Sequence, residues 1–255
     1  MAKVKRTGNI NAARITIDGI SGWPEVPAIL IPGNLQAYGI YDDFLGECNL
    51  AAGRTQDGWR LLVASGTWIL ANEAGGVGLL QTGAVNDQLA QITLGGETTG
   101  AFFPVANKDI YFEVRIKVGT AGAGTSNVAF GLIDPAAAAY LGAAGGGITV
   151  ADYICWETLD DGVTTWNFTA ASTAGGVDRN VTATELESLT YHTFGFWVNG
   201  ITAIYPFYDR VYEPLGLIAT ANIPLTGLMP FFAVRSGDGT NEPLYFDYCM
   251  CIQER

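Results

Sequence analysis

The segment Ile110-Tyr111-Phe112-Glu113-Val114-Arg115-Ile116-Lys117-Val118 decides the fold class of this 255-residue chain. Its even-numbered residues are all apolar, whereas Glu113, Arg115 and Lys117 occupy odd positions. Because successive side chains of a β-strand point to opposite faces, this period of two predicts a strand with one face in the core. Glu113 is expected on the solvent face, beside Arg115 and Lys117.

Segments of similar character recur along the chain, with turn residues between them. We predict further strands at residues 67–71, 78–82, 90–94, 127–133, 152–159, 164–170, 191–199, 202–209, 228–235 and 243–252. Many short strands with almost no helix favour an all-β fold, an antiparallel β-sandwich or jelly roll.

Turn and helix signals complete this pattern. The tight turns are predicted at Asp57-Gly58, Asp161-Gly162, Asn199-Gly200 and Asp238-Gly239, because these residue types tolerate positive φ. Two short helical connectors are expected, at Pro135 to Leu141 and at Thr184 to Leu189.

The composition limits the class of protein. The chain is 49% hydrophobic and only 15% charged, so it can bury a large core, and its length suits one sandwich domain. Its net charge of −12 opposes phosphate backbones, so we expect no nucleic-acid partner. No apolar run reaches the roughly 18 residues that cross a bilayer, and polar residues follow the basic N-terminus. We therefore expect no membrane partner and no export.

The four cysteines are Cys48, Cys155, Cys249 and Cys251, and their spacing matches no metal motif. Cys249 and Cys251 are two residues apart on a predicted strand, so they share one face and do not suit a disulfide. We predict that all four are reduced.

The N-terminal segment differs from the rest of the chain. Lys3, Lys5, Arg6 and Arg14 outnumber its acidic residues, and prolines interrupt it. We predict an extended arm over residues 1–38 and a jelly-roll domain over residues 39–255. Two interpretations stay open: a first edge strand packed on its own domain, or an arm that binds a neighbouring subunit or an acidic partner. The predicted partner-binding residues are Lys3, Lys5, Arg6, Arg14, Ile29, Leu30 and Ile31.

Two kinds of ligand are weighed from the residues. Gly237 to Glu242 offers carboxylate and amide oxygens, which suit either an Asp-Gly hairpin or a calcium ion. Exposed aromatic rings can stack on sugars, and the candidates are Trp59, Trp68, Trp156, Trp166 and Tyr205. Most rings are expected in the core.

The C-terminal half carries a family resemblance. Tyr191 to Gly200, Leu228 to Val234 and Leu244 to Cys249 resemble the closing strands of concanavalin A-like jelly rolls. Phe112 to Ile116 and Val128 to Asp134 look like the middle strands of that family. The similarity covers roughly residues 40 to 252 and implies a fold that hosts lectins, hydrolases and structural modules.

Catalytic patterns are missing from these strands. Jelly-roll glucanases carry Glu-x-Asp-x-x-Glu on one strand, whereas Glu113 and Glu157 each stand with too few acidic neighbours. The single histidine, His192, is predicted to be structural, at the start of a strand. We therefore expect that the chain is not an enzyme and that it holds no cofactor or metal.

An arm followed by Tyr41-Asp42-Asp43-Phe44 is similar to virion structural proteins of tailed bacteriophages, of the capsid decoration (cement) or head-fibre type. This resemblance implies a protein made in the host cytoplasm that binds the major capsid protein on the capsid exterior, as a homotrimer. The alternative is a carbohydrate-binding module or phage adhesin that recognises host-surface glycans. A glycosidase is a third hypothesis, with Glu157 as its test residue.

Overall fold

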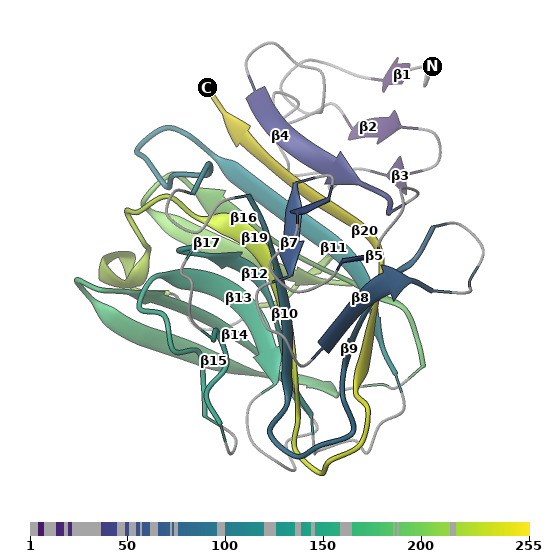
Figure 1. Ribbon diagram of the computed structural model, residues 1–255. Coiled ribbons are helices and arrows are strands. Elements are labelled where there is room, and N and C mark those ends of the chain that lie inside the picture. Colours follow the sequence, from purple (N-terminus) through teal and green to yellow (C-terminus); the bar gives the residue numbers. More distant parts are fainter. Residues whose placement is uncertain are drawn as a thin grey trace.

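The computed structural model has an all-β architecture of two large sheets and one small one (Figure 1). It describes residues 5–7, 14–17, 20–21, 37–44, 49–50, 55–56, 58–61, 66–71, 73, 76–95, 100–119, 126–135, 139–143, 146–158, 165–185, 187, 189–214 and 218–255. The strands are β1 (Lys5–Thr7), β2 (Arg14–Ile17), β3 (Ile20–Ser21), β4 (Ala37–Asp42), β5 (Asn49–Leu50), β6 (Thr55–Gln56), β7 (Trp59–Leu61), β8 (Gly66–Leu70), β9 (Gly78–Thr82), β10 (Leu89–Leu94), β11 (Ile110–Val118), β12 (Ser126–Ile133), β13 (Tyr153–Thr158), β14 (Thr165–Ser172), β15 (Gly176–Glu185), β16 (His192–Asn199), β17 (Ala203–Tyr208), β18 (Val211–Tyr212), β19 (Met229–Ser236) and β20 (Pro243–Glu254).

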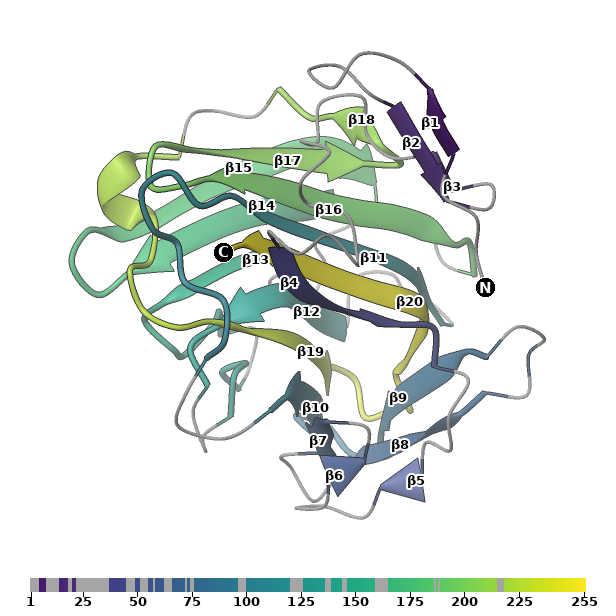
Figure 2. The same ribbon diagram turned by 90° about the horizontal axis from the view of Figure 1, so that it is seen from above.

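The two large sheets are antiparallel and form a sandwich, which confirms the predicted fold class. The eight-stranded sheet has the order β15-β14-β13-β12-β19-β10-β7-β6, and the nine-stranded sheet has the order β18-β17-β16-β11-β20-β9-β8-β5. β20 pairs with β11 along one side and with β9 and β4 on the other. Figure 2 shows β18, β17, β16, β11, β20 and β4 side by side.

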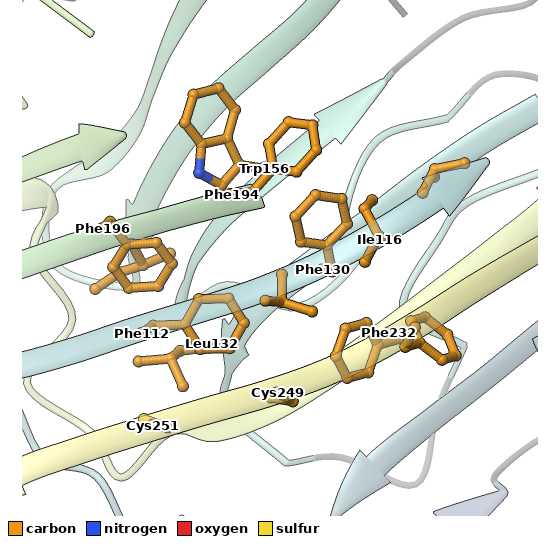
Figure 3. Packing of buried hydrophobic residues seen from close by; sticks show 14 of the residues in the cluster. Phe112, Ile116, Phe130, Leu132, Trp156, Phe194, Phe196, Phe232, Cys249 and Cys251 are labelled. Carbon is orange, nitrogen blue, oxygen red and sulfur yellow. The ribbon is translucent and has the colours of Figure 1, made fainter. Parts of the chain in front are cut away.

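The core lies between these sheets and follows the alternation of β11. Ile110, Phe112 and Val114 are fully buried on its inner face. Aromatic pairs join the sheets, with ring centroids 5.0 Å apart for Phe130 and Phe194. Burying one large apolar side chain contributes about 1.5–3 kcal/mol, so this shared core holds the sandwich together. Figure 3 shows the packing of Phe112, Phe130, Phe194 and Phe232.

Most predicted strands are present, with small shifts at their ends. β15 is a strand that the sequence analysis missed, and the helix predicted at Thr184 to Leu189 is wrong, because Thr184 and Glu185 end β15. β15 is the edge strand of its sheet, and its valines, Val177 and Val181, are exposed rather than in the core. The described part of Pro135 to Leu141 is not helical either, since Leu141 forms a β-bridge with Ile148.

Glycine geometry agrees with two of the predicted turns. Gly200 (φ +55°) lies between β16 and β17, and Gly239 (φ +80°) lies between β19 and β20. Asp57 and the Asp161-Gly162 turn lie outside the described residues.

Near the N-terminus, the described strands β1, β2 and β3 form their own antiparallel sheet. Lys5 and Arg6 lie in β1 and Arg14 lies in β2, whereas Lys3 and residues 29–31 (Ile29, Leu30 and Ile31) lie outside the described residues. The boundary at residue 38 stays a prediction. β4 pairs with β20 from Ala37 onward.

Within the described ranges, no helix has the length and apolar character that a membrane span requires.

Candidate functional site

The outer face of the nine-stranded sheet carries a continuous group of aromatic rings. Trp197 of β16 pairs with Tyr205 of β17, and their rings stack with centroids 5.0 Å apart. Tyr212 of β18 continues the group, 6.1 Å from the Tyr205 ring. We call Trp197, Tyr205 and Tyr212 the aromatic strip. Trp197 and Tyr205 are half-buried and Tyr212 is 44% exposed, so the strip can contact a ligand.

Polar side chains border the strip at one end of the sheet. Asn199 follows Trp197 by two residues on β16, so it shares the outer face. Asp109 directly precedes β11, and its backbone N–H donates to Oε2 of Glu254 at 3.2 Å. Glu254 lies at the end of β20 and is only partly buried. These carboxylate and amide groups can accept or donate hydrogen bonds to a ligand that contacts the strip.

The Asp109 carboxyl is half-buried at this border. Burial raises the pKa of Asp109, the Trp197 indole acts in the opposite direction, and the nearby Glu254 carboxylate raises that pKa further. The two carboxylates therefore form one acidic border beside Trp197.

Glu113 does not reach solvent, contrary to the expectation from the sequence. Its side chain is buried beneath the rings of Tyr111 and Tyr248, which both donate hydrogen bonds to its carboxylate. The Tyr248 hydroxyl lies 2.5 Å from Oε1 of Glu113, and the Arg210 guanidinium lies 3.3 Å from the same atom. The large side chains on this face close over Glu113, which the alternation pattern alone does not reveal.

The outer face of the eight-stranded sheet is covered differently. Tyr140 and Leu141 are fully buried on it, in a second apolar cluster that contains Phe231 and Tyr153. Arg235 holds the segment that contains Tyr140 and Leu141 against the sheet, because its guanidinium donates a hydrogen bond to the Leu141 carbonyl at 2.7 Å. This face is therefore filled by the chain itself over the middle strands.

Glu157 lies on the same face of this sheet, since it alternates with Tyr153 and Cys155 on β13. Its Oε1 accepts hydrogen bonds from Thr169 (2.6 Å) and from Nε of Arg179 (3.1 Å), while Oε2 has no hydrogen-bond partner among the described residues. Burial raises the pKa of Glu157, and both partners oppose that shift. The carboxyl is fully buried, so a substrate does not reach it without movement of the residues above it.

Most of the aromatic candidates named from the sequence are core residues. Trp59, Trp68, Trp156 and Trp166 are buried between the sheets, so their assignment as sugar-stacking rings is wrong. Tyr205 is half-buried within the strip. Trp197 and Tyr212 were missed. The strand period could have identified Trp197, because it alternates with the apolar Phe196 and Val198.

The remaining predicted sites are structural in this fold. His192 begins β16 as expected, and its Nδ1 lies 2.8 Å from Oδ2 of Asp209. Cys249 and Cys251 are free and share the core face of β20, whereas Cys48 lies outside the described residues.

In the loop after β19, the carboxylate of Asp238 accepts hydrogen bonds from within the loop. The backbone N–H of Thr240 donates to Oδ1 of Asp238 at 2.8 Å, and its hydroxyl donates to the same atom at 2.6 Å. In the part of the chain that the structure describes, no group of three or more His, Cys, Asp or Glu side chains is placed to hold a metal ion.

The fold matches solved structures, whereas the sequence comparisons found no match. No family model and no curated protein matches this sequence. Among solved structures, it is similar to the endo-1,3-beta-glucanase from Streptomyces sioyaensis, with a TM-score of 0.51 and 14% identity over 86% of this chain and 97% of that chain. The laminarinase from Rhodothermus marinus gives a TM-score of 0.55 and 10% identity over 85% of this chain and 98% of that one. Peanut lectin gives a TM-score of 0.54 and 9% identity over 85% of this chain and 97% of that one.

These similarities establish a concanavalin A-like jelly-roll fold. They also contradict the prediction that the chain is not an enzyme, because the proteins that share the fold include a glucanase and a laminarinase. That prediction relied on a missing sequence motif. At 10–14% identity, the absence of a motif does not exclude an enzyme.

Proposed function

We propose that this chain is a carbohydrate-binding protein whose ligand contacts the aromatic strip. The observation that carries the proposal is the arrangement of Trp197, Tyr205 and Tyr212 on three neighbouring strands, next to Asn199 and the acidic border. Sugars have apolar C–H faces and hydroxyl edges, so they need aromatic rings and hydrogen-bonding groups side by side. The similar folds of a lectin and two glucan-processing enzymes support this choice.

Binding to soluble polysaccharides tests the proposal. Isothermal titration calorimetry of the full chain would use laminarin and mixed-linkage β-glucan. Trp197→Ala and Tyr212→Ala each remove one ring, and we expect each to weaken binding roughly five- to tenfold or more. Release of reducing ends from the same polysaccharides, measured in parallel, tests for hydrolysis.

Val211→Ala is the matched control. Val211 precedes Tyr212 on β18 and is 65% exposed, so this variant perturbs the same strand without removing a ring. We expect it to bind as the wild type does. Failure of the wild type to bind either polysaccharide, or unchanged affinity in both ring variants, would refute the proposal.

Attachment to a phage capsid is a separate proposal, supported by the sequence resemblance. Its predicted contacts, from Lys3 to Ile31, belong to the N-terminal segment. Deleting residues 1–35 and measuring retention on capsids tests it, and undiminished retention would remove this segment from the mechanism.

A further inference from the structure

We propose that the aromatic strip selects an uncharged polysaccharide over a polyanionic one, and that Asp109 and Glu254 determine this selectivity. The inference rests on the proposed function, because it assumes that the ligand contacts the strip. It adds the chemical class of the ligand and the residues that impose it.

The first step of the argument is the position of the two carboxylates. Two hydrogen bonds connect Asp109 and Glu254. The Asp109 N–H donates to Oε2 of Glu254 at 3.2 Å, and the Glu254 N–H donates to the Asp109 carbonyl at 3.0 Å. Asp109 is also two residues before Tyr111, which pairs with Trp197. Both carboxylates therefore lie at the end of the strip, where the substituents of a bound sugar would project.

The second step concerns positive charge on this face. The basic side chains that β11 and the β17–β18 turn contribute are already paired with carboxylates: Arg115 with Asp247, Lys117 with Glu73, and Arg210 with Glu113. Each of these three cations is therefore balanced by a carboxylate other than Asp109 and Glu254.

The third step is the interaction that each ligand class would make. Hydroxyl groups donate hydrogen bonds to Asp109 and Glu254, and such charge-assisted bonds are strong. Carboxylate or sulfate groups at the same positions would meet like charges, on a chain whose net charge is −12. Uncharged polysaccharides therefore bind favourably, whereas polyanions are repelled.

A pair of glucans that differ only in charge tests this inference. Laminarin and carboxymethylated laminarin would be titrated into the full chain in about 20 mM and about 500 mM NaCl. We expect laminarin to bind at least about tenfold more tightly at low salt. The difference should shrink at high salt, where the Debye length falls to a few ångströms.

The variant Asp109→Asn with Glu254→Gln keeps the size of both side chains and removes both charges. We expect it to narrow the difference between the two glucans at low salt to within about threefold, mainly by improved binding of carboxymethylated laminarin. Asp134→Asn, which removes one acidic charge just after β12 in the other large sheet, is the control and should leave most of the difference in place.

The outcomes separate the two proposals. Equal affinity for both glucans at low salt, or an unchanged difference in the double variant, would refute the selectivity and leave carbohydrate binding intact. No binding of laminarin or of mixed-linkage β-glucan would refute the proposed function itself.

Discussion

The guanidinium of Arg210 lies 3.3 Å from the carboxylate of Glu113, although β16 lies between β17 and β11 in the sheet. Arg210 belongs to the turn between β17 and β18, and Glu113 lies on β11. The residue of β16 that pairs with Glu113 is Gly195, whose missing side chain leaves the outer face open for the guanidinium. The ion pair thereby connects the edge hairpin to the centre of the sheet.

Loss of the Glu113 charge should destabilise the fold. Glu113→Gln leaves Arg210 without its anionic partner and disturbs the hydrogen bonds from Tyr111 and Tyr248. Because the Arg210 side chain is 31% exposed, water compensates part of the loss. We expect the free energy of unfolding in urea to fall by about 1–3 kcal/mol. Glu187→Gln, at a side chain that is 60% exposed, should change it by about 0.5 kcal/mol or less. Equal effects of the two variants would contradict the assignment of Glu113 as a buried structural anion.

Arg210 should affect ligand binding through Tyr212. Asp209 and Arg210 both have positive φ, 46° and 63°, and their side chains join the turn before β18 to Thr193 and Glu113. Arg210→Ala removes the hydrogen bonds from its guanidinium to Glu113 and Tyr248 and should weaken laminarin binding about three- to tenfold. In the Tyr212→Ala background, Arg210→Ala should change the affinity for laminarin by less than about twofold, because the ring that Arg210 positions is gone. Calorimetric titration of the four proteins measures this coupling, and additive effects would show that Arg210 does not act through Tyr212.

Phe130 should be among the most sensitive positions in the core. It is fully buried and its ring contacts Trp166, Phe194 and Phe232. Phe130→Ala should lower the free energy of unfolding by about 3–5 kcal/mol, since it removes transfer energy and leaves a cavity. Phe103→Ala, at a ring that is 43% exposed, serves as the control and should cost much less. A loss of less than about 1 kcal/mol at Phe130 would be incompatible with its place between the sheets.

Glu157 should make stability depend on pH. Burial raises its pKa in the folded state above the ordinary value of 4.5, so the folded chain keeps a proton that the unfolded chain releases. The contribution of Glu157 to stability is therefore present below about pH 4.5 and is lost as the pH rises through the folded-state pKa. Arg179 is 42% exposed and can remain solvated without its partner.

Glu157→Gln isolates this effect, because glutamine resembles the protonated acid and does not titrate. The stability of the wild type relative to the variant should decrease as the pH rises through this window and then become constant. Urea denaturation of both proteins between pH 4 and pH 8 measures it. A difference that stays the same at every pH would show that Glu157 does not titrate with a raised pKa.

The sequence was sufficient to predict the sandwich because strand formation depends on a local property. The alternation in β11 and the turn residues Asn199-Gly200 and Asp238-Gly239 are read from neighbouring positions alone, and the structure confirms the strand and both turns, although it buries Glu113. The period of two also predicted that Cys249 and Cys251 share one face, and the structure shows that it is the core face. β15 escaped prediction because most of its residues are polar and its two valines, Val177 and Val181, are exposed.

The candidate site depended on pairing between distant segments, which no local pattern contains. Trp197 belongs to a group of rings only because β17 and β18 place Tyr205 and Tyr212 beside it. Asp109 meets Glu254 only because β11 and β20 pair, although 145 residues of sequence separate them. The same applies to Glu113, whose burial comes from Tyr248 and Arg210. Alternation assigns a side chain to a face of the sheet, but only the tertiary structure decides whether that face is open to water or covered by other residues.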